Sequence, residues 1–144
     1  MKIAGIVAEY NPFHTGHAYQ IACTRAQLGE DCAVAAVMSG HWVQGGRPAI
    51  ADKWTRTKLA LLGGADLVLE LPTVWAVSSA EAFARGAVEL LAAAQVVDVL
   101  SFGSECGDAD KLRRAAICLN SPEYEAGLRR FVEGGTPFAA ARQR

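Results

Sequence analysis

The sequence of 144 residues lacks any hydrophobic run that could cross a membrane, because Gly, Asp, Glu or Arg interrupts every candidate before the ~20 residues that a bilayer span needs. It also lacks paired cysteines: the four cysteines are widely spaced, and no two form a CxxC pair. The N-terminus does not have the charged-then-apolar layout of a signal peptide. These absences predict a cytoplasmic protein with free thiols and no membrane contact.

The sequence has little net charge, formally −1 at pH 7, which removes any global reason to expect nucleic acid as a partner. The charge is nevertheless unevenly distributed. Residues 41–58 carry a net +3 and residues 111–144 a net +4, whereas residues 59–110 carry a net −7. The two basic segments either face phosphates or are solvated helix faces.

The sequence contains neither a GxxxxGK[ST] loop nor a GxGxxG fingerprint, so neither a P-loop nor a dinucleotide-binding motif is present. What it does contain is an alternation of apolar runs and amphipathic segments. The apolar runs predict strands over residues 1–8, 32–38 and 66–72, and within 96–105, where the strand runs into Gly103. The pattern predicts a doubly wound, mostly parallel α/β sheet with helices on both faces and a single core.

Capping residues delimit the expected helices. A helix from Gly16 to about Leu28 stops at Gly29, and a helix that begins after Asp52 stops at Gly63. Further N-caps are predicted at Ser78, which has capping-box spacing to Glu81, at Ser121 before Pro122, and at Thr136 before Pro137. The apolar side chains predicted to lie in the core include Trp54, Leu61, Leu62, Trp75, Phe83, Ala87, Leu90, Leu91 and Ala94, and a further stripe runs from Leu112 to Leu119.

Two of the three histidines, His14 and His17, lie where the first strand gives way to a helix. Ligands of open α/β sheets bind at this position, where a helix N-terminus favours anions and Gly16 permits close approach. Imidazoles there can donate hydrogen bonds to a phosphate and follow the charge that builds during phosphoryl or nucleotidyl transfer. The alternatives are a metal site, for which no third ligand is nearby, and a structural pair with one packed and one solvated ring.

The segment "SGHWVQGGRPAIA", residues 39–51, follows neither the strand nor the helix period and is predicted to be a loop. Together with the start of the next helix it carries His41, Trp42, Arg47, Lys53 and Arg56. Cations next to an aromatic ring suit RNA phosphates and a stacked base, and they also suit an active-site lid.

The sequence segments that contain the histidines and the loop resemble those of one family. "IVAEYNPFHTGHAYQI", "VMSGHWVQGGRPAIADKWTRTKLALLGGADLVLELP", "SFGSECGD" and "PFAAARQ" are similar, in order and spacing, to the bacterial tRNA(Met) cytidine acetate ligases of the HxGH nucleotidyltransferase superfamily. The resemblance covers essentially the whole chain and implies a Rossmann-type fold of the HUP class. It also implies that residues 1–144 form one ATP-binding catalytic domain. Because the helix that starts at Thr136 and Pro137 is interrupted about two turns later, the chain is expected to be cut inside a helix and to be the N-terminal part of a longer protein.

The resemblance further implies a reaction, in which ATP and acetate give acetyl-adenylate and pyrophosphate, and the acetyl group passes to N4 of the wobble cytidine of elongator tRNA(Met). His14 and His17 are the implied catalytic residues, and Mg²⁺ is expected to accompany ATP. The implied ATP-binding residues are Gly103 and the segment Val7, Ala8, Glu9, Tyr10, Asn11, Pro12, Phe13, His14, Thr15, Gly16, His17, Ala18, Tyr19 and Gln20. Possible contacts with substrate or tRNA are Ser39, Gly40, Arg47, Lys53, Arg56, Ser104 and Glu105; for Glu105, helix capping is an equal alternative.

One position departs from the family pattern, because Gly45 stands after Gln44 where an arginine is more usual, and Arg47 follows two positions later. Two other functions remain open from the sequence. One is a nucleotidyltransferase that adenylylates or cytidylylates a small phosphorylated metabolite, and the other is a catalytically incomplete RNA-binding module. The sequence leaves the oligomeric state open.

Overall fold

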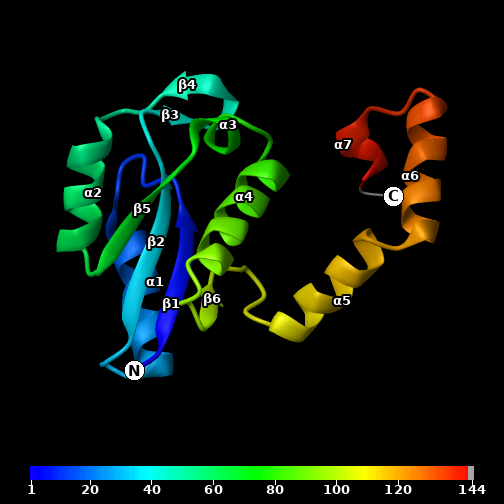
Figure 1. The fold of residues 1–144 in the computed structure, drawn as a ribbon. Helices are drawn as coiled ribbons and strands as arrows, with labels where there is room; N and C mark the ends of the chain where they lie inside the picture. Colours follow the sequence, from blue (N-terminus) through cyan, green and yellow to red (C-terminus); the bar gives the residue numbers. More distant parts are fainter. Residues whose placement is uncertain (143–144) are drawn as a thin grey trace. The chain divides into compact units, whose positions relative to one another are not determined.

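The computed structural model describes residues 1–142, which divide into two compact units, with the boundary in the sequence between Gly103 and Ser104. Figure 1 shows the fold of each unit. The first unit contains a parallel sheet covered by helices, and the second contains only helices. No helix within residues 1–142 has the length and apolar character that crossing a membrane requires.

The first unit is built on four parallel strands: β1 (Ile3–Ala8), β2 (Ala33–Ser39), β5 (Leu67–Leu71) and β6 (Val99–Ser101). Their order across the sheet is β5-β2-β1-β6, so the chain moves outward from β1 to one side and later returns to the other side. The predicted doubly wound parallel sheet is confirmed. Beside β1 lies the topological switch point at which such sheets bind ligands.

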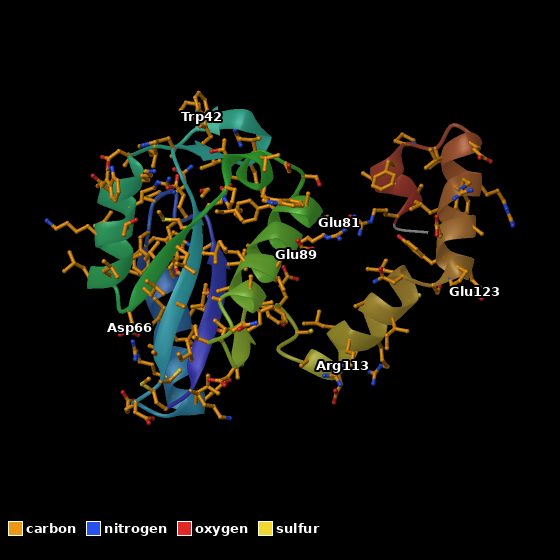
Figure 2. All side chains as sticks on the ribbon, viewed as in Figure 1. Trp42, Asp66, Glu81, Glu89, Arg113 and Glu123 are labelled. Atoms are coloured by element: carbon orange, nitrogen blue, oxygen red, sulfur yellow. The ribbon has the colours of Figure 1, made fainter. Side chains whose placement is uncertain are left out.

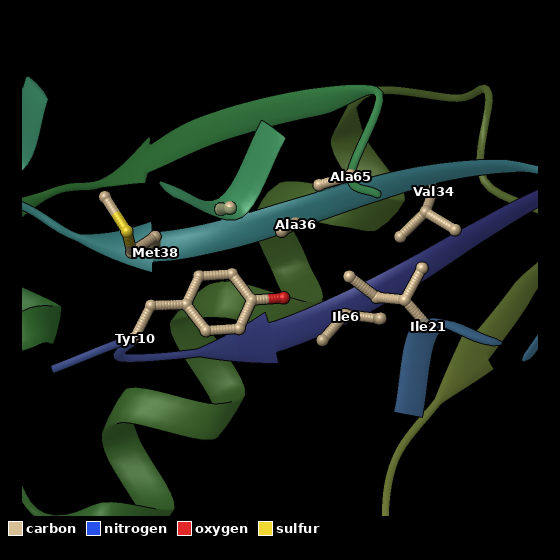
Figure 3. Packing of buried hydrophobic residues seen from close by; sticks show 8 residues of the cluster. Ile6, Tyr10, Ile21, Val34, Ala36, Met38 and Ala65 are labelled. Carbon is tan, nitrogen blue, oxygen red and sulfur yellow. The ribbon is translucent and has the colours of Figure 1, made fainter. Parts of the chain in front are cut away.

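Helices cover both faces of this sheet, because the side chains of a strand alternate between faces. One core cluster joins Val34, Ala36 and Met38 of β2 to α1 (Thr15–Leu28) and α2 (Lys53–Leu62), as Figure 3 shows in part. The other cluster joins Val37 and Leu71 to α3 (Thr73–Ala76) and α4 (Ala80–Ala93). The predicted cover on both faces is confirmed.

Three side chains predicted for the core are instead exposed on α2, namely Trp54 (72%), Leu61 (44%) and Leu62 (76%). The reason is the register of the helix. Arg56 and Ala60 are the buried residues of α2, and at 3.6 residues per turn Trp54, Leu61 and Leu62 point away from them. Trp75 packs against the second cluster as predicted. In α4, Phe83, Ala87, Leu90 and Leu91 join that cluster, but Ala94 ends the helix and is exposed.

The sequence does not predict the short helix α3, and its presence shifts the N-cap of α4 by one residue. Ser79, not Ser78, caps α4, because its hydroxyl accepts from the Ala82 amide (3.3 Å). The Ser78 hydroxyl instead donates to the Val74 carbonyl and closes α3. Asp52 caps α2 as predicted.

The second unit contains α5 (Ala109–Leu119), α6 (Pro122–Glu133) and α7 (Phe138–Ala141). Ser121 caps α6 with Pro122 at its start, as predicted, whereas the N-cap of α7 is Pro137 and not Thr136. No residue of α5 or α6 is buried, so the predicted stripe from Leu112 to Leu119 is solvent-accessible within this unit. The last part of the "PFAAARQ" segment, from residue 143 on, lies outside the described residues.

Candidate active site at the carboxyl edge of the sheet

The two histidines of the "HTGH" segment form the cap of α1. His14 is the N-cap, and its Nδ1 accepts a hydrogen bond from the Gly16 amide (3.1 Å). His17 reaches back, and its Nδ1 accepts from the His14 amide (3.2 Å). The imidazole rings stack with their centroids 3.7 Å apart. The helix thus begins at Thr15, one residue earlier than predicted, because a histidine takes the role that Ser, Thr, Asp or Asn usually fills.

These caps decide the tautomer of both rings. A neutral imidazole has one donor nitrogen and one acceptor nitrogen, and in both rings Nδ1 is the acceptor. The proton therefore lies on Nε2, so the pair offers two Nε2–H donors. Burial, and secondarily electrostatic repulsion from the adjacent His14 ring, lowers the pKa of His17, which favours its neutral form.

Aromatic packing holds His17 in place. The Tyr10 ring meets the His17 ring edge-on at 4.9 Å and the Phe13 ring at 5.0 Å. Phe13 in turn lies against Gly63 at the end of α2, where a Cβ would overlap its ring. Tyr10 itself is buried with a positive φ of 46°, and burial raises the pKa of its phenol to about 12. Its hydroxyl has no hydrogen-bond partner among residues 1–142.

Hydrogen bonds also fix α1 to β6. The Gln20 side-chain amide donates to the Ser101 carbonyl (3.2 Å), and the Thr24 and Ser101 hydroxyls lie 2.7 Å apart. Gly103 follows β6 by two residues and lies exposed at the same edge of the sheet, with open space where a Cβ would be. Sequence reasoning missed Thr24 and Ser101, although a polar residue inside an apolar strand was an available signal.

The predicted loop 39–51 contains a small two-stranded ribbon. In this ribbon β3 (Trp42–Val43) pairs antiparallel with β4 (Arg47–Pro48) around a short 3₁₀ turn, Gln44–Gly46. Gly45 has a φ of 76°, a conformation that favours glycine over the arginine more usual in the family pattern. Trp42 is 48% exposed and Arg47 is exposed, so the ribbon presents an aromatic ring and a cation to solvent.

The ribbon and the histidine segment are joined, although they lie apart in the sequence. The Glu9 carboxylate accepts from the Gln44 amide, and the Asn11 side-chain oxygen accepts from the Ile50 amide, both at 2.7 Å. The histidine segment and the ribbon, both identified from the sequence as candidate site segments, therefore lie next to each other at the carboxyl edge of the sheet.

The structure corrects the expected environment of Arg56, which is fully buried and so does not present its side chain to RNA. Ser39 and Gly40 are buried beside it. Lys53 pairs with Glu70 (2.6 Å), a residue that sequence reasoning missed, and lies 5.2 Å over the Trp54 ring. A cavity of about 100 Å³ is lined by Lys53, Trp54 and Glu70 together with Met38, Thr57 and Val68.

The implied ATP-binding segment lies mostly within reach of solvent. Tyr10 is its one buried residue, whereas Pro12, His14, Thr15, Gly16 and Tyr19 are exposed and the other residues from Val7 to Gln20 are half-buried. Ser104 and Glu105 are exposed in the second unit, where the Ser104 hydroxyl accepts from the Gly107 amide (3.0 Å). Within residues 1–142, no group of three or more His, Cys, Asp or Glu side chains is placed to hold a metal ion.

The fold and the capped histidines are those of a nucleotidyl transferase. The family described as HIGH Nucleotidyl Transferase matches residues 1–144. The tRNA(Met) cytidine acetate ligase of Thermoanaerobacter sp. (strain X514) is 50% identical over 99% of this chain and 36% of its own length, and that of Clostridium tetani is 48% identical over 100% and 36%. The crystal structure of Thermotoga maritima TmcAL bound with alpha-thio ATP is also similar, with a TM-score of 0.87 and 44% identity over 99% of this chain and 35% of that one.

The chain belongs to the HIGH nucleotidyl transferase family, and it is similar in sequence to the tRNA(Met) cytidine acetate ligases. It spans about a third of the length of the curated relatives that it matches.

Proposed function

We propose that this chain adenylates acetate with ATP and serves the acetylation of N4 of the wobble cytidine in elongator tRNA(Met). The observation that carries the proposal is the pair of histidines at the start of α1, which offers two Nε2–H donors beside a helix N-terminus. The relatives' names supply acetate, cytidine and tRNA(Met), and the alpha-thio ATP in the Thermotoga maritima structure supports ATP as the nucleotide.

The proposed adenylation step requires groups that stabilise negative charge on the phosphoryl oxygens, and these groups need not gain or lose a proton. An acetate oxygen attacks the α-phosphorus of ATP in line, the bond from that phosphorus to the bridging oxygen breaks, and pyrophosphate leaves. Charge on the phosphoryl oxygens is met by the Nε2–H groups of His14 and His17 and by the positive end of the α1 dipole. In the second step N4 of the cytidine attacks the acetyl carbon, the bond from that carbon to the phosphate oxygen breaks, AMP leaves, and one N4 proton is released to solvent.

The nucleotide is proposed to bind at the topological switch point of the sheet, beside the carboxyl end of β1. ATP contacts the segment from Val7 to Gln20 and approaches Gly103, where no side chain stands in the way. Mg²⁺ is proposed to enter with ATP, held mainly by phosphate oxygens and water, as is usual for this ion.

The proposed RNA surface is the ribbon of residues 42–48. Trp42 can stack on an unpaired base, and Arg47 can contact a phosphate. Lys53 is proposed to face the substrate from the start of α2, and Ser39 and Gly40 to contribute through their backbone. Ser104 and Glu105 are proposed to contact substrate or tRNA, and this proposal rests on the family pattern alone. A protein with this substrate is expected in the cytoplasm.

The test is exchange of labelled pyrophosphate into ATP, measured with and without acetate and in the absence of tRNA. The proposal predicts exchange that depends on acetate. Exchange that requires a small phosphorylated metabolite instead would identify a plain nucleotidyltransferase. Retention of tRNA without any exchange, in the full-length protein, would identify a non-catalytic RNA-binding module.

A further inference from the structure

Arg56 is the largest fully buried side chain among residues 1–142, with an exposed fraction of 0%. Its guanidinium donates only to uncharged oxygens. Nη1 donates to the Glu9 carbonyl (2.6 Å), Nη2 to the carbonyls of Ser39 (2.9 Å) and Gly40, and Nε to the Ala51 carbonyl (3.2 Å).

The acidic groups around Arg56 are engaged elsewhere. Glu9, Asp52 and Glu70 all favour its charge from a distance, but their carboxylates accept from Gln44, Thr55 and Lys53 respectively. No ion pair to Arg56 is present among residues 1–142. A buried cation without a carboxylate is costly, and it is tolerated only where its donors are satisfied.

The carbonyls bound by Arg56 come from three segments that carry candidate site residues. Glu9 follows β1 and precedes the two histidines, Ser39 and Gly40 end β2 and begin the ribbon loop, and Ala51 ends that loop before α2. One planar guanidinium thus sets the spacing between the histidine segment and the loop.

We propose that Arg56 is a positioning residue of the adenylation site, which holds the histidine segment and the ribbon loop in register without touching substrate. The inference rests on the proposed function for its kinetic readout. Lysine cannot replace arginine here, because its single ammonium lacks the fork of donors that reaches several carbonyls at once. The consequence is that the fork, and not the charge alone, aligns the reacting groups.

Arg25 provides a matched control. Its guanidinium also binds two backbone carbonyls, those of Cys32 and Gly64, and it adds the Asp66 carboxylate (2.8 Å). These partners lie at the amino ends of β2 and β5, far along the strands from the histidine segment. Arg25→Lys therefore removes a comparable fork without disturbing the site.

The experiment compares Arg56→Lys and Arg25→Lys in the full-length protein, at a temperature at which both are folded. The expected result is a fall of about 10²-fold in kcat for acetate-dependent exchange in Arg56→Lys, with KM for ATP changed far less, because small misplacements of reacting groups have effects of that size. Arg25→Lys should stay within about twofold of wild type in both parameters. Equal kinetic losses in the two variants would overturn the proposal.

A second readout does not depend on catalysis. The imidazole NMR signals of His14 and His17 should shift in Arg56→Lys and stay in place in Arg25→Lys; unchanged signals in Arg56→Lys would contradict the positioning role even if wild-type exchange is absent. Arg56→Gln, which keeps an amide donor but removes the charge, is the second variant, and it should show the same shifts. If both Arg56 variants are unfolded while Arg25→Lys folds, Arg56 acts in folding and the proposal is overturned.

Discussion

The amino ends of the parallel strands form one edge of the sheet, the amino edge, and their carboxyl ends form the carboxyl edge. An arginine binds backbone groups at each of these edges, but the two arginines differ in whether a carboxylate neutralises their charge. At the amino edge Arg25 pairs with Asp66, whose carboxylate also accepts from the Val34 amide (2.7 Å). At the carboxyl edge Arg56 donates to backbone carbonyls and to the Ser39 hydroxyl (3.5 Å), and none of these acceptors is charged. Figure 2 shows Asp66 and Trp42 at these opposite edges.

The difference supports the proposal that the carboxyl edge binds the ligand. The amino edge neutralises its own charge, so it has little left to offer an anion. The carboxyl edge keeps a positive guanidinium, a helix N-terminus and two imidazole donors on the same side. In the proposed function a triphosphate meets the imidazole donors and the helix N-terminus, while Arg56 stays buried behind them without touching it.

The largest expected effect is at the histidine pair. His14→Ala or His17→Ala should lower the rate of acetate-dependent pyrophosphate exchange about 10²–10³-fold, the usual loss when a donor to a developing oxyanion is removed. Initial-rate assays at saturating ATP measure it. Either variant exchanging at the wild-type rate would exclude the carboxyl edge as the adenylation site.

Gly63→Ala tests how far the carboxyl edge depends on packing. The added Cβ overlaps the Phe13 ring, which supports His17, so the free energy of unfolding should fall by about 1–3 kcal/mol, as overpacking usually costs. Denaturant unfolding measures the fall, and the exchange rate should drop with it. Gly127→Ala, where a Cβ meets nothing within 4 Å, is the control and should cause neither a loss of stability nor a fall in the exchange rate.

Asp66→Asn tests the amino edge. The variant weakens the bonds to Arg25 and to the Val34 amide, so stability should fall by about 1–2 kcal/mol, discounted because the carboxylate is 51% exposed. The exchange rate of the folded protein should remain that of wild type. A large kinetic loss here would erase the contrast between the two edges.

Acid should destabilise the carboxyl edge through His17. Its pKa is lowered in the folded state, so the unfolded chain binds the proton more tightly. The contribution of His17 to stability is therefore full above the unfolded pKa of about 6.5 and falls as the pH drops below it. Unfolding curves from pH 8 to pH 5 should show this fall, and the wild-type curve should descend more steeply than that of His17→Gln.

The smallest effect, and the only expected gain, concerns Tyr10→Phe. The Tyr10 hydroxyl is buried without a partner among the described residues, so its removal should leave stability unchanged or raise it by about 1 kcal/mol. Thermal unfolding measures the change. A clear loss of stability would show that the hydroxyl has a partner in solution.

The sequence was sufficient for the parallel sheet, because four apolar runs alternate with helical patterns, and for the place of the histidines at the end of β1. It was insufficient where a side chain acts at long range. The periodicity of α2 gave no way to see that Arg56 points inward and Trp54 outward, since that choice depends on carbonyls at Glu9 and Ser39. Glu70 was missed for the same reason, as its partner Lys53 lies 17 residues earlier.

The reciprocal caps of His14 and His17 have a consequence for folding. Each ring is oriented by a backbone amide that takes this position only when the first turn of α1 has formed. The site and the helix start are thus one cooperative event, and fraying of a single turn disassembles the histidine pair. Enzymatic activity should therefore report on the order of that turn long before the rest of the sheet unfolds.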